Sequence, residues 1–327
     1  MRLIPLALVG LATLGGMAVP GLAQAPGPPG LAWPVDCRVG RDCAIQHYVD
    51  RDPSPAVKDY ACGARSYDGH NGVDIRLPDM AAQRRGVSVL AAADGQVLRV
   101  RDGMADRSIA TTGRAAVKDV ECGNGVVIAH VGGLETQYCH LARGSLRVKP
   151  GEAVKAGQPI GQVGLSGDTE FPHLHLTVRE AGKVVDPFAY GAAEGSCNGG
   201  RSLWRETPAY QARVVLNTGF SGAAVTPEAV EEAAAVRADA SAGVLIAYVR
   251  AIGLHAGDAQ SLSILKPDGA VLRTYALPAL PRDQDQYFMR DGAVRPPQGW
   301  SKGRYEAVYT VVNGGRTVLT TRFQLTL

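Results

Sequence analysis

Polar and apolar residues alternate over short stretches along most of this chain, and a helical period is rare. Clear examples are residues 73–77 and 173–178, each preceded by a glycine-containing turn. Because successive side chains of a strand point to opposite faces of a sheet, this period of two predicts strands. Short strands separated by frequent turns predict an all-β fold with antiparallel sheets.

One predicted strand carries two histidines on the same face. His173 and His175 alternate with Leu174 and Leu176, directly after a glycine-rich turn at 164–170. Residues two apart on a strand lie about 7 Å apart and look into one space. Two imidazoles in that position suggest a metal site or a general-base site. The alternative is a pair of exposed strand histidines without a chemical role.

A second candidate group lies at the start of another predicted strand, which covers residues 73–77. The alternation there places the Asp74 carboxylate opposite the apolar side chains, and the turn pair at 71–72 can bring His70 back beside it. Carboxylate oxygen and imidazole nitrogen are both ligands that zinc accepts. On its own this spacing is a weak pattern, since a histidine near a solvated aspartate often arises by chance.

Over about residues 65–190 the chain resembles the M23 family of zinc metallopeptidases, also called LytM or lysostaphin-type peptidases. Four motifs in the family's order carry the resemblance: Gly69-His70-Asn-Gly72-Val-Asp74, Tyr138-Cys-His140-Leu, Val154-Lys-Ala-Gly157-Gln-Pro-Ile-Gly161, and Gly164 through His173-Leu-His175-Leu. The resemblance implies that His70, Asp74 and His175 bind zinc and that His140 and His173 are catalytic. Three protein ligands leave a fourth tetrahedral position open, as in catalytic zinc sites.

The resemblance implies a secreted zinc-dependent endopeptidase that hydrolyses peptide cross-links of cell-wall peptidoglycan. Its substrates would be the stem peptides of the wall, and the Ala- and Gly-rich composition favours a D-alanyl–diaminopimelate bridge over pentaglycine. The main alternative is a non-catalytic LytM-type regulator that activates cell-wall amidases, although all five site residues are present. A third hypothesis is an enzyme that acts on a protein outside the wall, with the C-terminal domain binding the substrate.

The first 25 residues have the features of a secretory signal peptide. Arg2 precedes an apolar run to about Val19, and small residues follow as far as Ala25. Cleavage after Ala25 fits the A-x-A form, and cleavage after Ala23 is the alternative. No later stretch is long and apolar enough to span a bilayer. The signal peptide and the disulfides expected from the cysteines predict a secreted, periplasmic protein.

Six cysteines behind an export signal predict three disulfides. Cys122 and Cys139 flank a predicted hairpin, which favours a bond between them. By elimination the other bonds are Cys37–Cys43 and Cys62–Cys197. The nearly equal numbers of basic and acidic residues, 34 and 31, give no reason to expect a nucleic-acid partner.

Motifs, cysteines and composition divide the chain into five parts. They are a signal peptide (1–25), a Cys-containing N-terminal extension (26–64), an M23 peptidase domain (65–192), a linker (193–204) and a β-sandwich domain (205–327). About seven short strand-like segments in the last part, with a hairpin turn at 313–315, predict an immunoglobulin-like sandwich. Such a fold assigns no function, so the partner of this domain is left open.

Three histidines outside the motifs are given no direct role in chemistry. His130 ends an apolar strand and is expected to be structural, or to hydrogen-bond a metal ligand from outside. His47, in the Cys-rich extension, and His255, in a predicted loop, are expected at the surface. Tyr138 shares a predicted strand face with His140, and either lines the groove or packs in the core.

Overall fold

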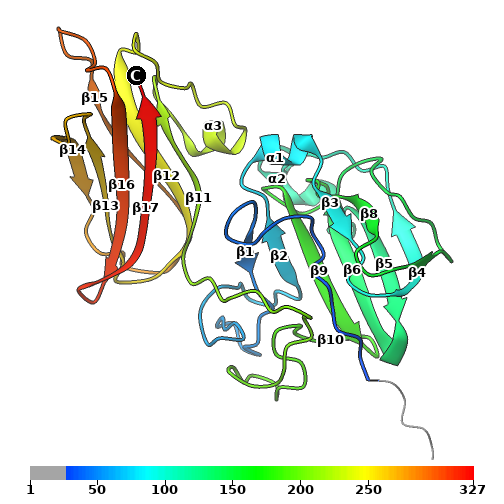
Figure 1. Ribbon diagram of the computed structural model, residues 1–327. Coiled ribbons are helices and arrows are strands. Elements are labelled where there is room, and N and C mark those ends of the chain that lie inside the picture. The colour runs from blue at the N-terminus through cyan, green and yellow to red at the C-terminus, as the bar shows by residue number, and fades with distance from the viewer. Residues whose placement is uncertain (1–26) are drawn as a thin grey trace, which may run out of the picture.

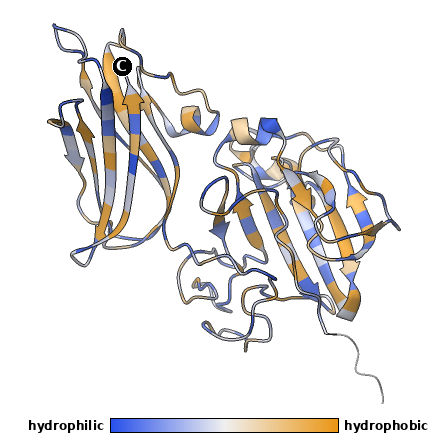
Figure 2. Ribbon diagram, in the orientation of Figure 1, coloured by the Kyte–Doolittle hydropathy of each residue, from blue (hydrophilic) through white to orange (hydrophobic). Residues whose placement is uncertain are grey.

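The computed structural model describes residues 27–327, so the predicted signal peptide at 1–25 lies outside the described residues. The chain forms two β-rich bodies, an N-terminal body built on residues 27–204 and a C-terminal body built on residues 214–327 (Figure 1). Apolar and polar residues alternate along their strands, as Figure 2 shows. The predicted all-β, antiparallel fold class is confirmed, and its physical basis is this alternation.

The N-terminal body is built on one antiparallel sheet of eight strands. In hydrogen-bonding order these are β1 (Ala44–His47), β2 (Val73–Arg76), β9 (His173–Glu180), β6 (Leu134–Leu141), β5 (Asn124–His130), β4 (Gly95–Arg101) and β7 (Ala153–Val154), with β10 (Lys183–Val184) paired to β9. Two further strands, β3 (Ser88–Leu90) and β8 (Pro159–Gln162), form a separate antiparallel pair. All four candidate motifs therefore belong to this body.

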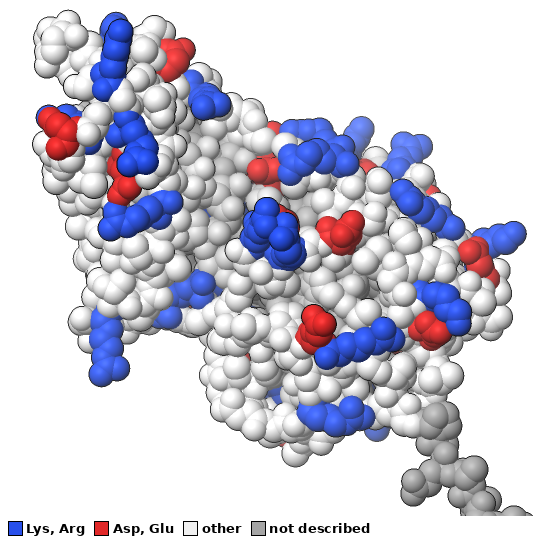
Figure 3. Space-filling model, viewed as in Figure 1, with Lys and Arg blue, Asp and Glu red and all other residues white. Residues whose placement is uncertain are grey.

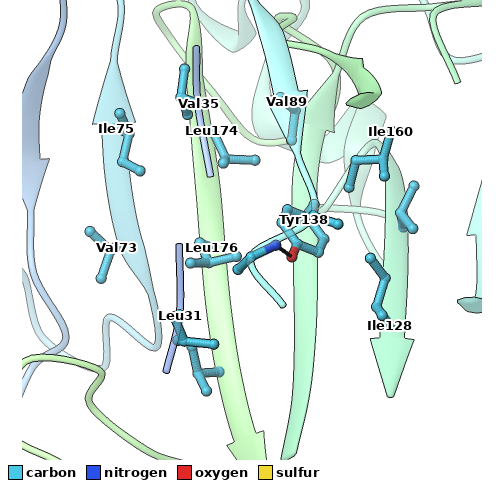
Figure 4. Close-up of a cluster of buried hydrophobic side chains, with 14 of the residues drawn as sticks. Leu31, Val35, Val73, Ile75, Val89, Ile128, Tyr138, Ile160, Leu174 and Leu176 are labelled. Carbon is cyan, nitrogen blue, oxygen red and sulfur yellow. Dashed lines mark hydrogen bonds between the residues drawn. The ribbon is translucent and has the colours of Figure 1, made fainter. Parts of the chain in front are cut away.

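Apolar side chains from one face of the large sheet form the first core. Figure 4 shows Leu174 and Leu176 of β9 packed between side chains of the neighbouring strands and of the β3–β8 pair. Tyr138 is fully buried among them, and its hydroxyl accepts a hydrogen bond from the N–H of Ala92 at 2.8 Å. Of the two roles considered for Tyr138, the structure supports packing in the core.

The Cys-containing extension adds a strand to the edge of this sheet. Its strand β1 pairs with β2, the strand that carries Asp74. The structure contains all three expected disulfides, Cys37–Cys43, Cys62–Cys197 and Cys122–Cys139. Two of them involve the extension, which is therefore bonded covalently both within itself and to the chain after β10.

The C-terminal body consists of two antiparallel sheets around a second core. The first sheet contains β11 (Val214–Ser221), β12 (Val244–Leu254) and β15 (Gln284–Val294); the second contains β14 (Val271–Ala276), β13 (Ala259–Leu265), β16 (Arg304–Asn313) and β17 (Arg316–Thr326). Side chains such as Leu245, Leu262 and Tyr309 fill the space between them. The immunoglobulin-like assignment stays a prediction.

Helices in residues 27–327 are few and short. They are α1 (Met80–Arg85), α2 (Ile109–Thr112) and α3 (Pro227–Glu231), with 3₁₀ turns η1 (Arg114–Val117) and η2 (Val131–Gly133). In the described part of the chain, none of the helices has the length and hydrophobicity that a bilayer crossing requires. Helix α3 projects from the C-terminal body towards α1 and α2 (Figure 1). Basic and acidic side chains are interspersed on the face shown in Figure 3.

Candidate metal centre and active site

Three of the expected site residues bring their ligand atoms together. His175 Nδ1 lies 2.8 Å from Asp74 Oδ1, His70 Nε2 lies 3.2 Å from the same oxygen, and the two nitrogens are 3.3 Å apart. Ligand atoms at about 2.0–2.1 Å from a tetrahedral zinc ion are roughly 3.3 Å from one another. The carboxylate and the two imidazoles therefore fit a zinc ion with a fourth position open.

The register between β2 and β9 explains part of this convergence. Asp74 pairs directly with His175, so both side chains leave the sheet on the same face, while their neighbours enter the core on the other. His70 lies on the turn before β2. A side chain at Gly72 would come within 2.5 Å of His175 Nε2, so this turn needs a glycine for the strands to approach closely.

Hydrogen bonds on the outer sides of the rings determine which nitrogen of each ligand is free. His70 Nδ1 lies 2.7 Å from the carbonyl oxygen of Tyr48, to which it donates. His175 Nε2 lies 3.0 Å from Asn71 Oδ1. Donation at these nitrogens leaves His70 Nε2 and His175 Nδ1 as lone-pair donors towards the metal position, the usual arrangement of histidine ligands.

The two expected catalytic histidines lie beside the metal position. The rings of His140 and His173 have centroids 4.6 Å apart, and His173 Nε2 is 3.5 Å from Asp74 Oδ1. His140 Nδ1 donates to the carbonyl of Ser166 at 2.7 Å, and His173 Nδ1 donates to that of Phe171 at 3.0 Å. In both residues Nε2 is therefore the nitrogen left unprotonated.

A β-bulge directs His140 to this site. Between two matched pairs, Asn124–Leu141 and Val126–Tyr138, β6 has one residue more than β5. His140 lies in the extra stretch with φ of 63°, a left-handed conformation that is uncommon outside glycine. The expectation that Tyr138 and His140 share a face is therefore wrong, because the bulge breaks the alternation and turns His140 away from the core.

Burial and neighbouring charges shift the pKa values of the site in a consistent direction. Burial lowers the pKa of His140 well below its usual value, and His173 and His175 lower it further. Burial also lowers the pKa of His175. For Asp74 burial acts in the opposite sense, but electrostatic interaction with His70 and His173 and hydrogen bonds from His173 and His175 hold its pKa well below normal. An ionised carboxylate beside neutral imidazoles is the protonation state that a metal needs.

The histidines line a groove with a cavity volume of about 450 Å³ that both bodies build. From the N-terminal body, Arg114 and Phe171 contribute to its walls. From the C-terminal body, Glu228, Asp285 and Gln286 contribute. The sequence patterns missed this second wall, because nothing in the strands of residues 205–327 indicates which surface meets another body.

Among the other histidines, His47 differs from its expectation. It is buried, with 8% of its surface exposed, and its Nδ1 lies 3.1 Å from Asp74 Oδ2. The sequence did not predict its place on β1, opposite Asp74, because the Cys-rich extension lacks a long alternating stretch. The strand is only four residues long, 44–47, which is too short for a clear alternation. His130 is structural as expected, since it contacts the carbonyl of Asp94 and the hydroxyl of Thr136.

Part of the N-terminal body matches a known protein family. Residues 68–187 match the model of peptidase family M23. These residues form an M23 peptidase domain. The M23 domain contains all five expected site residues, and M23 is a family of metallopeptidases. The resemblance inferred from the four motifs is thereby confirmed.

Two curated relatives and one solved structure illustrate the similarity. The chain is 32% identical over 124 residues to the cell division protein DipM of Caulobacter vibrioides, covering 36% of this chain and 17% of DipM. It is 33% identical over 117 residues to the peptidoglycan DD-endopeptidase ShyB of Vibrio cholerae, covering 36% and 22%. A mutant catalytic domain of the M23 protein EnpA from Enterococcus faecalis has 25% identity and a TM-score of 0.33, covering 47% of this chain and 96% of that one. The chain thus spans about a fifth of the length of these curated relatives.

Proposed function

We propose that this protein is a zinc-dependent endopeptidase that hydrolyses peptide cross-links of cell-wall peptidoglycan. The observation that carries the proposal is the convergence of His70, Asp74 and His175 on one point, with the unprotonated nitrogens of His140 and His173 beside it. This arrangement can hydrolyse an amide, because it combines a set of metal ligands that leaves one position open with two further imidazoles in the same groove.

The site histidines have two different roles in such a reaction, metal binding and proton transfer. When bound by His70, Asp74 and His175, zinc supplies Lewis-acid activation of water and of the scissile carbonyl. His140 and His173 present Nε2 atoms that can accept the proton of the attacking water and return a proton to the leaving amine. Their N–H groups on the far side are held by backbone carbonyls, so both rings are oriented before a substrate arrives.

The proposal also covers the bond that is cut and the compartment in which the protein acts. ShyB, one of the relatives, is a peptidoglycan DD-endopeptidase, which supports a D,D bond of the peptide cross-links as the target. A bridge of the D-alanyl–diaminopimelate type meets that description, whereas pentaglycine does not. Three disulfides in the described residues support folding in an oxidising compartment, and we propose the periplasm.

The direct test is digestion of purified cell-wall sacculi and of cross-linked muropeptide dimers by the full mature chain. The proposal expects release of uncross-linked muropeptides, blocked by a chelator and restored by added zinc. Unchanged dimers after incubation with zinc-loaded protein would refute it. Stimulation of an added amidase without any cleavage by the protein alone would instead indicate the regulatory role that some proteins with LytM-type domains have.

A further inference from the structure

We propose that His47 is a positioning residue of the metal centre, which holds the Asp74 carboxylate in the orientation that binds zinc. This role rests on the proposed zinc site and extends it beyond the M23 domain, since His47 lies outside residues 68–187. Through His47, the Cys-containing extension would contribute a functional residue to the site.

The two oxygens of Asp74 have separate partners. Oδ1 faces His70, His173 and His175 at 3.2, 3.5 and 2.8 Å. Oδ2 faces His47 Nδ1 at 3.1 Å. A carboxylate only accepts hydrogen bonds, so His47 donates its Nδ1 proton to Oδ2. This bond restrains rotation of the carboxylate and leaves Oδ1 directed at the metal position. Hydrogen bonds to the outer side of a ligand typically have this orienting effect.

The surroundings of His47 hold its ring in place. In the β1–β2 register His47 is opposite Asp74, next to a bulge between Ile45 and His47. The ring packs edge-on against Tyr67, with centroids 5.2 Å apart, and against His70 at 5.8 Å. These contacts come from the turn that carries the metal ligand His70, so the ring lies between two ligands of one metal.

The C-terminal body contacts the far side of the same ring. His47 Nε2 lies 3.7 Å from the Asp285 carboxylate, and the side chain of the preceding residue, Gln46, donates to the backbone carbonyl of Asp285 at 3.2 Å. No hydrogen bond to Nε2 is formed in the described residues, so Asp285 acts on the ring through its charge. The two contacts place strand β15 against β1 directly behind the metal centre.

Four variants of the full mature chain test the role. His47→Ala removes the donor, and His47→Leu removes it while filling more of the volume. His47→Asn keeps a donor, because the asparagine amide nitrogen is as many bonds from the backbone as histidine Nδ1. His130→Ala is the matched control: His130 is also 8% exposed and hydrogen-bonded in the same sheet, but it contacts Asp94 and Thr136 instead of a metal ligand.

The measurement is zinc affinity, by competition with a chelator of known affinity, on samples whose fold is verified by circular dichroism. Loss of a partner that orients a metal ligand typically weakens binding 10–100-fold. We expect about that loss in His47→Ala and His47→Leu, recovery of most of the affinity in His47→Asn, and unchanged affinity in His130→Ala. The absorption spectrum of bound Co²⁺ should change in the same two variants, reporting altered ligand geometry.

The outcomes separate this inference from the proposed function. If wild type binds zinc and His47→Leu binds it equally well with an unchanged Co²⁺ spectrum, His47 has no positioning role and the proposed endopeptidase stands. If His47→Ala fails to fold, the comparison of His47→Leu with His47→Asn decides, since equal affinities in these two refute the role. If wild type itself holds no zinc, the proposed function fails, and the role of His47 fails with it.

Discussion

Asp74 and His175 lie directly opposite each other on β2 and β9, with their ligand atoms 2.8 Å apart. Their chain neighbours point into the core, where Leu174 and Leu176 are fully buried. A slip of one residue between the two strands would exchange these faces, moving leucines to the groove and the ligands into the core. The hydrophobic core and the candidate metal centre are therefore specified by the same register.

The first prediction concerns the metal. Purified wild-type protein should contain about one zinc ion per chain, as expected for three converging ligands. His175→Ala removes one of these three ligands, and it should abolish stable zinc binding. Elemental analysis of dialysed protein measures this. His255→Ala, which changes a histidine of the C-terminal body, should keep full occupancy. Full occupancy in His175→Ala would contradict the ligand assignment.

The second prediction concerns the two histidines that are not in the ligand set. His140→Ala and His173→Ala should each keep zinc but lower kcat by about 10²–10⁴-fold, the usual contribution of a general acid or base. Hydrolysis of muropeptide dimers, measured alongside the zinc content of the same samples, checks both parts. Loss of zinc in either variant would move that residue into the ligand set.

The candidate site could be predicted from the sequence where it depends on local alternation. His173 and His175 were found in this way, because their spacing of two and the flanking leucines describe a strand on their own. The direction of the His140 side chain could not be predicted from the sequence, because it depends on a bulge in β6 that only the pairing with strand β5 reveals. His47 was missed for a related reason: its importance comes from pairing with β2, a contact between segments far apart in the chain.

The C-terminal body shows the same limit on a larger scale. Its strands were predicted from alternation and a hairpin turn, and its two sheets bear this out. Its contribution to the groove, through α3 and β15, depends on how two separately folded surfaces meet. From the sequence, charged residues on a short helix such as α3 are predicted to be exposed to solvent. Only their contacts with residues far away in the chain show that some of them lie between the two bodies.

The third prediction concerns stability and pH. Asp186 is buried, and burial raises its pKa to about 6, although the N–H of Phe188 and the charge of Arg51 act in the other direction. In the unfolded chain an aspartate has a pKa of about 3.9. Below that value the carboxyl is protonated in both states and carries no penalty. As the pH rises towards 6 and above, the unfolded chain releases the proton first, so this group lowers the stability of the fold.

Asp186→Asn should remove this effect. A difference of about two pKa units corresponds to about 3 kcal/mol. Relative to wild type, the variant should therefore gain up to about 3 kcal/mol in free energy of unfolding between pH 4 and pH 7. The asparagine oxygen can still accept the bond from Phe188 that Asp186 accepts at 2.8 Å. Urea unfolding at several pH values measures the difference, and parallel curves for the two proteins would contradict the prediction.

The fourth prediction concerns the contact between the two bodies. Glu231, at the end of α3, accepts hydrogen bonds through one carboxylate oxygen from Arg76 of β2 and from Arg250 of β12. Both arginine side chains are almost completely buried. Burial lowers the pKa of Arg76 to about 10, so it keeps its charge at neutral pH. Arg76 follows Asp74 by two residues on the same strand, so this ion cluster is close to the candidate metal centre.

Glu231→Ala should destabilise the protein by about 3–5 kcal/mol, because it leaves two buried guanidinium groups without their shared counter-ion. The next residue provides a matched control. Glu232 pairs with Arg84 at 3.4 Å, but both side chains are more than half exposed. Exposed pairs of this kind typically contribute about 0–1 kcal/mol, so Glu232→Ala should change the free energy of unfolding little. Chemical denaturation of the three proteins at neutral pH measures both effects. Equal stability of the two variants would show that α3 is not anchored through Glu231, and that the C-terminal wall of the groove is held by other contacts.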